Sequence, residues 1–247
     1  GTLRLADIAA AIKPDDPHFA RTRLVVLENT TGGQVLPTAY IAEVAQLARS
    51  RGLALHLDGA RLFNAATANA QTHGTDVYDE ARAICQHFDT ASLCLSKGLG
   101  APVGSLLLGR ADFIRQAKRT RKILGGAMRQ CGMLAAAGHH ALQHHVRRMA
   151  DDHALLRQLA DGLAQAGRDH PVLQGRLAVA SAHTNILFTD VDAELAPALT
   201  AWLAQHGVRI TSSLYGGQTR LRWVAHLDVG PDDVAQTLDC VHRFRSA

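Results

Sequence analysis

The 247-residue sequence lacks several features, and each absence narrows what the protein can be. No apolar run approaches the length of a membrane-spanning helix, and the N-terminus carries no signal-peptide pattern. We therefore expect a soluble, cytoplasmic protein with no membrane partner. Paired spacing is also missing among the four cysteines, which are Cys85, Cys94, Cys131 and Cys240. Neither a disulfide framework nor a zinc site is predicted, and Cys85 and Cys94 are expected to be buried, reduced thiols.

Aromatic residues make up only 4% of the sequence, although its net charge is +4 and its pI is near 9.1. The one dense basic cluster is RQAKRTRK at 115–122, and no recognition motif accompanies it. A solvated helix face is the better reading of this cluster, and a contact to a single bound phosphate is the alternative. No nucleic-acid partner is predicted.

The pattern of apolar runs predicts an α/β fold for residues 1–150, the first of two expected domains. Strands are expected to alternate with helices, which is typical of a mostly parallel sheet covered by helices. The segment 104–109 follows the preceding strand too closely for a helical crossover, so it is expected to pair antiparallel. The predicted strands are 24–28, 53–58, 91–96 and 104–109, and the predicted helices are 38–52, 77–88 and most of 111–166, with a break at Gly125-Gly126.

A small α+β domain is predicted for residues 151–247. Its expected strands are 184–191, 208–210 and 221–227, and its expected helices are 194–207 and 232–244.

Polar residues follow three of the predicted strands of the first domain. They are Glu28-Asn29-Thr30, Asp58 and Ser96-Lys97. Ligands of open α/β sheets gather at the carboxyl ends of the strands, so these residues are expected to converge on one crevice.

Lysine is scarce, and Lys97 is the only one of four lysines that follows a buried strand. An amine there is expected to be partly desolvated, which favours the neutral, nucleophilic form that makes Schiff bases. Taken alone, the tripeptide SKG is better read as a lysine extending to the surface. Asp58 is compatible with the acid that a pyridine-type cofactor needs at its ring nitrogen, or with a plain helix N-cap.

Five motifs give the sequence a resemblance to the L-threonine aldolases of the low-specificity type, which are pyridoxal-phosphate (PLP) enzymes with the aspartate-aminotransferase fold, PLP fold type I. The motifs occur in the family's order and spacing, and the match covers essentially the whole chain. They are LENTTGGQVLP, LALHLDGARLFNA, LCLSKGLGAPVGSLLLG, RKILGGAMRQCGMLAAAG and LRWVAHLDV.

The resemblance implies a role for each matching residue. Lys97 would form the Schiff base with PLP, and Asp58 would pair with the ring nitrogen. Arg61 would lie near the phenolic oxygen and the substrate carboxylate, which Arg222 would also bind. Lys122 and Arg129 would reach the cofactor phosphate of a neighbouring subunit in a homotetramer built as a dimer of dimers.

The sequence departs from the family pattern in two places. Thr31 stands where many members have a histidine that lines the pocket near the substrate hydroxyl, and a hydroxyl is a poorer base than an imidazole. The opening, GTLRLADIAAAI, matches the interior of the family, so roughly its first quarter, with a phosphate loop and a ring-stacking histidine, is expected to be absent.

The resemblance predicts an enzyme of amino-acid metabolism that cleaves L-threonine-type or L-allo-threonine-type β-hydroxy-α-amino acids to glycine and an aldehyde. One alternative is a β-eliminating lyase of the same fold, which would release pyruvate and ammonia. The other is an inactive fragment or proteolysed piece.

Other polar residues are given structural roles. The cluster HHALQHH at 139–145 is read as a polar helix face, with a metal site as a minor alternative. His226 is expected on the strand of Arg222 in a supporting role, and Asn185 is expected to orient a loop. No metal is predicted.

Overall fold

The computed structural model describes residues 2–215 and 217–245. Within this part of the chain, the backbone divides into two compact units between Arg147 and Arg148. Residues 1, 216, 246 and 247 lie outside the described part.

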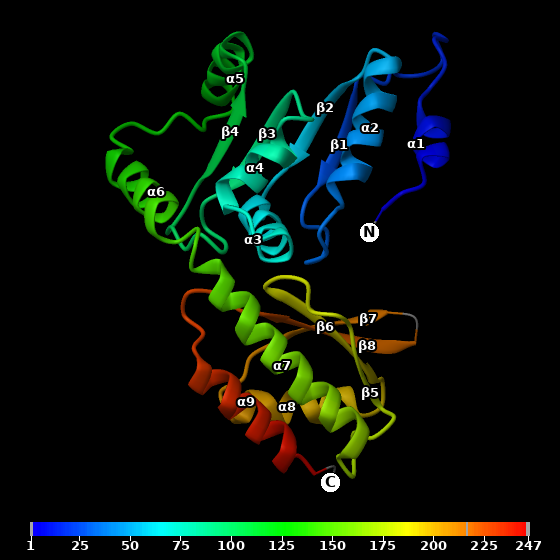
Figure 1. Cartoon of the computed structure of the whole chain (residues 1–247), viewed down its shortest axis with the longest axis vertical. Coiled ribbons are helices and arrows are strands. Elements are labelled where there is room, and N and C mark those ends of the chain that lie inside the picture. Colours follow the sequence, from blue (N-terminus) through cyan, green and yellow to red (C-terminus); the bar gives the residue numbers. More distant parts are fainter. Residues whose placement is uncertain (1, 216, 246–247) are drawn as a thin grey trace. The chain divides into compact units, whose positions relative to one another are not determined.

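A four-stranded sheet organises the first unit (Figure 1). Its order is β1-β2-β3-β4, and its strands are β1 (Leu24–Glu28), β2 (Ala54–Asp58), β3 (Thr90–Cys94) and β4 (Ser105–Gly109). The first three strands are parallel, and β4 runs antiparallel to β3. The predicted mostly parallel sheet and its antiparallel neighbour at 104–109 are therefore confirmed.

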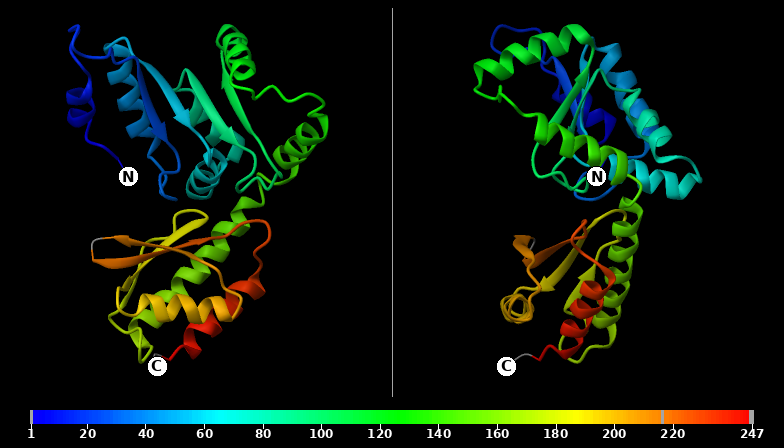
Figure 2. Two further views of the ribbon diagram at one scale, coloured as in Figure 1. Left: turned by 180° about the vertical axis from the view of Figure 1, so that it is seen from behind. Right: turned by 90° about the vertical axis from the view of Figure 1, so that its left-hand side faces the viewer.

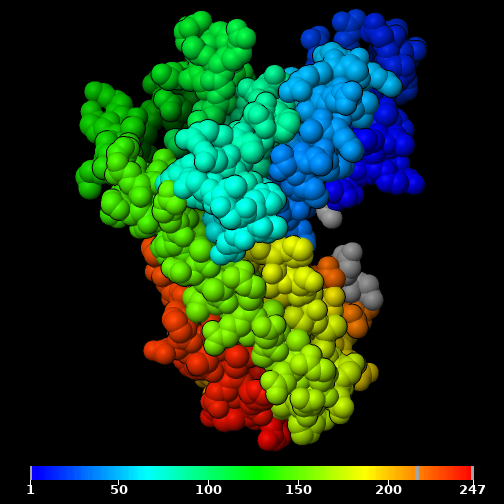
Figure 3. Space-filling view, viewed as in Figure 1, coloured from blue at the N-terminus to red at the C-terminus, as the bar shows by residue number. Residues whose placement is uncertain are grey.

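One face of this sheet is covered by α2 (Thr38–Ser50), α3 (Leu62–His73) and α4 (Val77–Cys85), which lie together on that side in Figure 2. Their side chains form a continuous layer over it in Figure 3. The apolar stripe of α2 explains its place, because Ile41, Val44, Ala45 and Ala48 recur at helical spacing and are all buried.

Three further helices complete the first unit. They are α1 (Leu5–Ala11), α5 (Ala111–Ile123) and α6 (Gly132–His144). Helix α5 carries the basic cluster of 115–122 and buries none of its residues, as expected of a solvated face. All five residues of β4, which precedes α5, are also exposed.

The second unit is an antiparallel sheet packed with helices. The sheet has the order β5-β6-β8-β7, with strands β5 (Leu177–Val179), β6 (Ile186–Asp192), β7 (Thr211–Tyr215) and β8 (Gln218–Val224). The helices are α7 (Met149–Asp169), α8 (Ala196–Gln205) and α9 (Pro231–Arg243). Leu163, Leu203 and Leu221, from α7, α8 and β8, meet in one core, which makes this an α+β unit.

The strand predicted at 208–210 is wrong. Helix α8 ends in a turn in which the Val208 amide donates to the Leu203 carbonyl at 2.9 Å, so the chain enters the sheet only at Thr211. The predicted strand at 221–227 also ends early, at Val224, which leaves His226 outside it.

The cysteine expectations are confirmed in one respect and corrected in another. All four cysteines are free thiols, but Cys85 and Cys94 are half-buried rather than buried. Among the described residues, no helix combines the length and the apolar character that crossing a membrane requires.

Near the start of α7, His153 is fully buried. Burial, with a smaller contribution from the Arg157 charge, lowers the pKa of His153 from its usual 6.5 to about 4. The folded protein therefore takes up this proton only near pH 4, whereas the unfolded chain takes it up near pH 6.5.

We predict that the free energy of unfolding falls by on the order of 2 to 3 kcal/mol as the pH drops from 7 to 4.5, through His153 alone. Denaturant titrations at several pH values measure this slope. His153→Gln should flatten it, whereas His139→Gln, at an exposed position in α6, should not. Equal slopes in all three proteins would contradict the assignment.

Candidate active site

The carboxyl ends of β1, β2 and β3 lie at one edge of the first sheet. Their register places Glu28 beside Asp58, and Asp58 beside Ser92. Because the three strands are parallel, the polar residues that follow them lie at this same edge. That they line one crevice stays a prediction.

Asp58 ends β2 in a tight turn. Its Oδ1 accepts a hydrogen bond from the Ala60 amide at 3.1 Å, and its backbone carbonyl accepts one from the Asn29 amide at 3.0 Å. The N-cap of the following helix α3 is Arg61, so Asp58 is not a helix cap. The carboxylate is half-buried at the strand end, where it is available to a ligand.

Gly59 allows the turn after Asp58 to approach β3. A Cβ at this position would lie 2.6 Å from the Ser92 carbonyl oxygen. No other residue fits without moving one of the two strand ends. The sequence analysis did not single out Gly59, although a glycine directly after a strand-ending acid was a usable signal.

Lys97 lies in the turn that follows β3. The Gly100 amide donates to the Lys97 carbonyl at 2.8 Å, and the Ala101 amide donates to Leu95 at 2.9 Å. This turn carries the Lys97 side chain outward, so it is exposed. The expectation of partial desolvation is wrong for the described chain.

Thr31 closes a small hairpin after β1. Its backbone bonds with that of Gln34 in both directions, and Gly32 and Gly33 between them adopt positive φ angles. The Thr31 hydroxyl donates to the Glu28 carbonyl at 2.8 Å. The hydroxyl proton of Thr31 is therefore already used in a hydrogen bond within this loop.

Two residues of the same loop, Asn29 and Thr30, are buried. Asn29 is fully buried, and its Oδ1 accepts from the Leu36 amide at 3.1 Å. Asn29 Nδ2 and the buried Thr30 hydroxyl have no hydrogen-bond partner among the described residues.

His56, in β2, is a further polar residue near Asp58 in sequence that sequence reasoning missed. It lies two positions before Asp58 in β2, so both side chains are on the same face of the sheet. Its Nδ1 lies 2.7 Å from the Thr90 hydroxyl. The period-two spacing from Asp58 was the available signal.

Arg222 belongs to the second unit, on β8. Its neighbour on the same face, Arg220, forms a two-point ion pair with Asp190 at 2.7 and 2.8 Å, which lowers the pKa of Asp190. No ion pair involves Arg222 in the described part of the chain, and the side chain is half-buried. Its guanidinium can therefore bind an anion.

The remaining predicted site residues lie in the first unit. Arg61, the N-cap of α3, is half-buried, whereas Lys122 in α5 and Arg129 after it are exposed. Among the described residues, which include the four histidines of 139–145, no group of three or more His, Cys, Asp or Glu could hold a metal.

Comparison with known protein families shows which family the chain belongs to. The sequence model of the beta-eliminating lyases matches residues 1–194. The chain belongs to the beta-eliminating lyase family. This match covers the first unit and the start of the second.

Several curated proteins similar to the chain are named as threonine aldolases. The low-specificity L-threonine aldolase of Escherichia coli K12 is 45% identical over 236 residues, which are 96% of this chain and 64% of that protein. The low-specificity L-threonine aldolase 1 of Arabidopsis thaliana is 39% identical over 97% of this chain and 64% of its own length. The resemblance carried by the motifs is thus confirmed, and the chain spans about two thirds of these relatives.

Solved structures confirm the fold class. The threonine aldolase of Leishmania major superposes with a TM-score of 0.78 at 20% identity, covering 98% of this chain and 67% of that one. The serine palmitoyltransferase of Sphingomonas wittichii superposes with a TM-score of 0.67 at 20% identity, over 90% and 54%.

We predict that Gly59→Ala destabilises the protein by about 1 to 3 kcal/mol, because the added methyl group must displace the end of β2 or β3. Chemical denaturation measures the change. Gly132→Ala is the control, since a Cβ there meets nothing within 4 Å. Equal stability of the two variants would show that the strand ends are not closely packed.

Proposed function

We propose that the protein is a PLP-dependent lyase that cleaves β-hydroxy-α-amino acids of the L-threonine and L-allo-threonine type to glycine and an aldehyde. The observation that carries this proposal is a carboxylate and a lysine, Asp58 and Lys97, after adjacent parallel strands. The threonine aldolases among its relatives support the same reaction.

The residues at the strand edge fit the ring of PLP. Asp58 offers a carboxylate, and Lys97 offers an accessible amine. Gly59 has no side chain, so the backbone after Asp58 can lie close to Ser92. When bound, PLP supplies a protonated pyridine ring that accepts the electrons of the broken bond.

Each residue has a defined task in this proposal. Lys97 would hold the cofactor through its amine. Asp58 would hold the proton of the ring nitrogen. Arg61 and Arg222 bind the substrate carboxylate, and a planar fork of donors suits that group.

Removal of the substrate's hydroxyl proton needs a base. Thr31 is a poor candidate because its own hydroxyl donates to the Glu28 carbonyl. We propose that Thr31 contacts the substrate only as a hydrogen-bonding neighbour, and that a water molecule accepts the proton.

The basic residues proposed to bind the cofactor phosphate come from another copy of the chain. Lys122 and Arg129 are exposed, so they can extend beyond their own subunit. We propose that they reach the cofactor phosphate of a neighbour in a homotetramer, and that this assembly works in the cytoplasm.

A β-eliminating lyase is the second candidate function, because the family that matches residues 1–194 carries that description. The products separate the two reactions. Glycine and an aldehyde indicate aldol cleavage, whereas a 2-oxo acid and ammonia indicate elimination.

We predict that the purified chain with added PLP releases aldehyde from L-threonine, and that Lys97→Ala lowers this rate by at least about 1,000-fold, because the covalent step is lost. An aldehyde reductase assay measures the release. Lys13→Ala removes an exposed lysine of the N-terminal segment and should leave the rate unchanged. Turnover in Lys97→Ala, or none in the unaltered chain, would contradict the proposal.

We predict that Arg222→Lys lowers kcat/KM for L-threonine by roughly 10-fold or more, since an ammonium cannot bind a carboxylate at two points. Steady-state kinetics measure the loss. Arg243→Lys, whose arginine pairs with Asp239 on α9, is the control. Equal kcat/KM values would remove Arg222 from the substrate site.

A further inference from the structure

The end of helix α6 contacts the turn that carries Lys97. His145 is the C-cap residue of α6, and its ring Nδ1 lies 2.7 Å from the Leu99 carbonyl oxygen. A carbonyl oxygen only accepts hydrogen bonds, so Nδ1 carries the hydrogen and donates it. Leu99 comes two positions after Lys97, in the turn that the Gly100 amide closes by donating to the Lys97 carbonyl. A side chain of α6 therefore bonds directly to the backbone beside Lys97.

This hydrogen bond is the link between the turn and the rest of the fold. The other backbone bonds of the turn, from the Gly100 amide to Lys97 and from the Ala101 amide to Leu95, close it on itself. Among the described residues, the bond from His145 is the one hydrogen bond that joins residues 97–100 to another element. Loss of this bond would leave the shape of the turn but release its backbone from α6.

Close packing brings α6 and the turn together. Gly138 in α6 is buried, and a Cβ at this position would lie 2.9 Å from Leu95 Cδ1. The helix therefore approaches the end of β3 at a point where a larger residue does not fit without a shift. Leu99 is only 2% exposed, so the residue that accepts the hydrogen bond is also fixed by its own side chain.

The end of α6 is itself attached to α4, one of the helices that cover the sheet. The Tyr78 hydroxyl in α4 donates to the Leu142 carbonyl at 3.2 Å. Asp76, the N-cap of α4, pairs with Arg147 at 2.6 Å. His145 lies between Leu142 and Arg147 in sequence, so its backbone is held on both sides.

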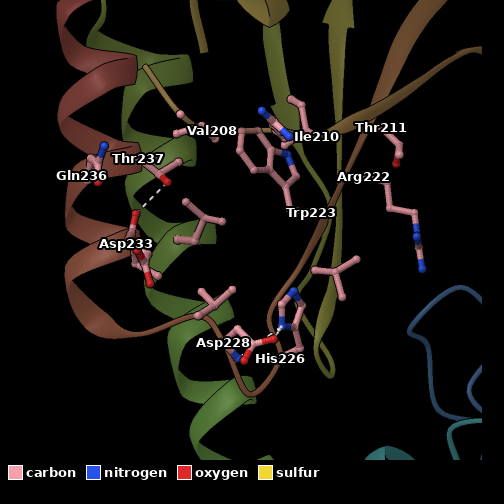
Figure 4. A pocket seen from close by; sticks show the side chains of 16 residues that line it. Val208, Ile210, Thr211, Arg222, Trp223, His226, Asp228, Asp233, Gln236 and Thr237 are labelled. Carbon is pink, nitrogen blue, oxygen red and sulfur yellow. Dashed lines mark hydrogen bonds and ion pairs between the residues drawn. The ribbon is translucent and has the colours of Figure 1, made fainter. Parts of the chain in front are cut away.

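The sequence distance that this bond spans distinguishes His145 from a histidine with only local contacts. His226, which lines a cleft of about 530 Å³ in the second unit, pairs with Asp228 two positions further on, and Figure 4 shows this contact. His145 instead bonds to a residue 46 positions away. A contact between segments so distant in sequence fixes one segment against the other.

We propose that His145 is a positioning residue for Lys97. Its hydrogen bond to the Leu99 carbonyl holds the turn in one place, so that the Lys97 amine stays at the sheet edge where Asp58 lies. The proposal rests on the proposed function, because it concerns how Lys97 meets PLP. His145 acts through the turn, without contact to the cofactor or the substrate.

Two substitutions separate the hydrogen bond from the volume of the side chain. His145→Asn keeps an N–H donor near the position of Nδ1, whereas His145→Leu fills a similar volume without a donor. His144→Leu is the control, because it removes an exposed neighbouring histidine whose ring stacks on His140 at 4.4 Å between centroids.

Amide hydrogen exchange in the protein without PLP tests the hold on the turn. His145→Leu should speed exchange of the Gly100 and Ala101 amides by roughly 5-fold or more, because the lost hydrogen bond makes local opening easier. The Asn29 amide, which donates to the Asp58 carbonyl in a neighbouring loop, should keep its rate. A general loss of stability would instead speed all three amides. His145→Asn and His144→Leu should leave all three rates unchanged.

Borohydride trapping tests the consequence for the cofactor. The PLP concentration that labels half of Lys97 should rise at least roughly 5-fold in His145→Leu, because the turn spends less time in the binding arrangement. In His145→Asn and His144→Leu it should stay within about 2-fold of the unaltered protein.

Three outcomes would overturn the proposal. The first is unchanged exchange of the Gly100 and Ala101 amides in His145→Leu. The second is an unchanged PLP concentration for half-labelling in that variant. The third is an equal effect of His145→Leu and His145→Asn. Failure of the proposed function gives a different result, because Lys97 of the unaltered protein is then not labelled. That result removes the role of His145 toward the cofactor whatever the exchange rates are.

Discussion

The parallel pairing of β1, β2 and β3 is the constraint on which the candidate site depends. It sets Glu28, Asp58 and Ser92 side by side, so that the loops after three strands begin at one edge. The Asn29 amide fixes the first loop to the Asp58 carbonyl, and Gly59 lets the second approach Ser92. The position of Asp58 is thus determined by backbone geometry, and its carboxylate is left for a ligand.

The roles proposed for the charged residues follow from which of them already have a partner within the fold. Arg220 is neutralised by Asp190, whereas its neighbour Arg222 has no such partner among the described residues. Lys97 is carried outward by its turn, so its amine is accessible but not desolvated by its own chain.

The strands of the first sheet and the polar residues at their ends could be predicted from the sequence, because hydrophobic periodicity and turn residues are local signals. Sequence reasoning placed Asp58 and Lys97 after neighbouring strands and anticipated the antiparallel strand at 104–109. It failed at the turn that holds Lys97 and at the helix end that keeps 208–210 out of the sheet. Hydrogen bonds between residues three to six apart form both, and the apolar pattern carries no signal for them. It also missed the half-exposure of Cys85 and the close approach of Gly59 to Ser92, which depend on packing between elements.

The central claim is that the edge formed by β1, β2 and β3 holds PLP through Lys97. Borohydride reduction of the PLP-treated protein, followed by peptide mass spectrometry, tests it most directly, because reduction makes the lysine–cofactor bond permanent. The account predicts one modified lysine, Lys97, with Lys13, Lys118 and Lys122 unmodified. Labelling spread over all four lysines, or absent from Lys97, would contradict it.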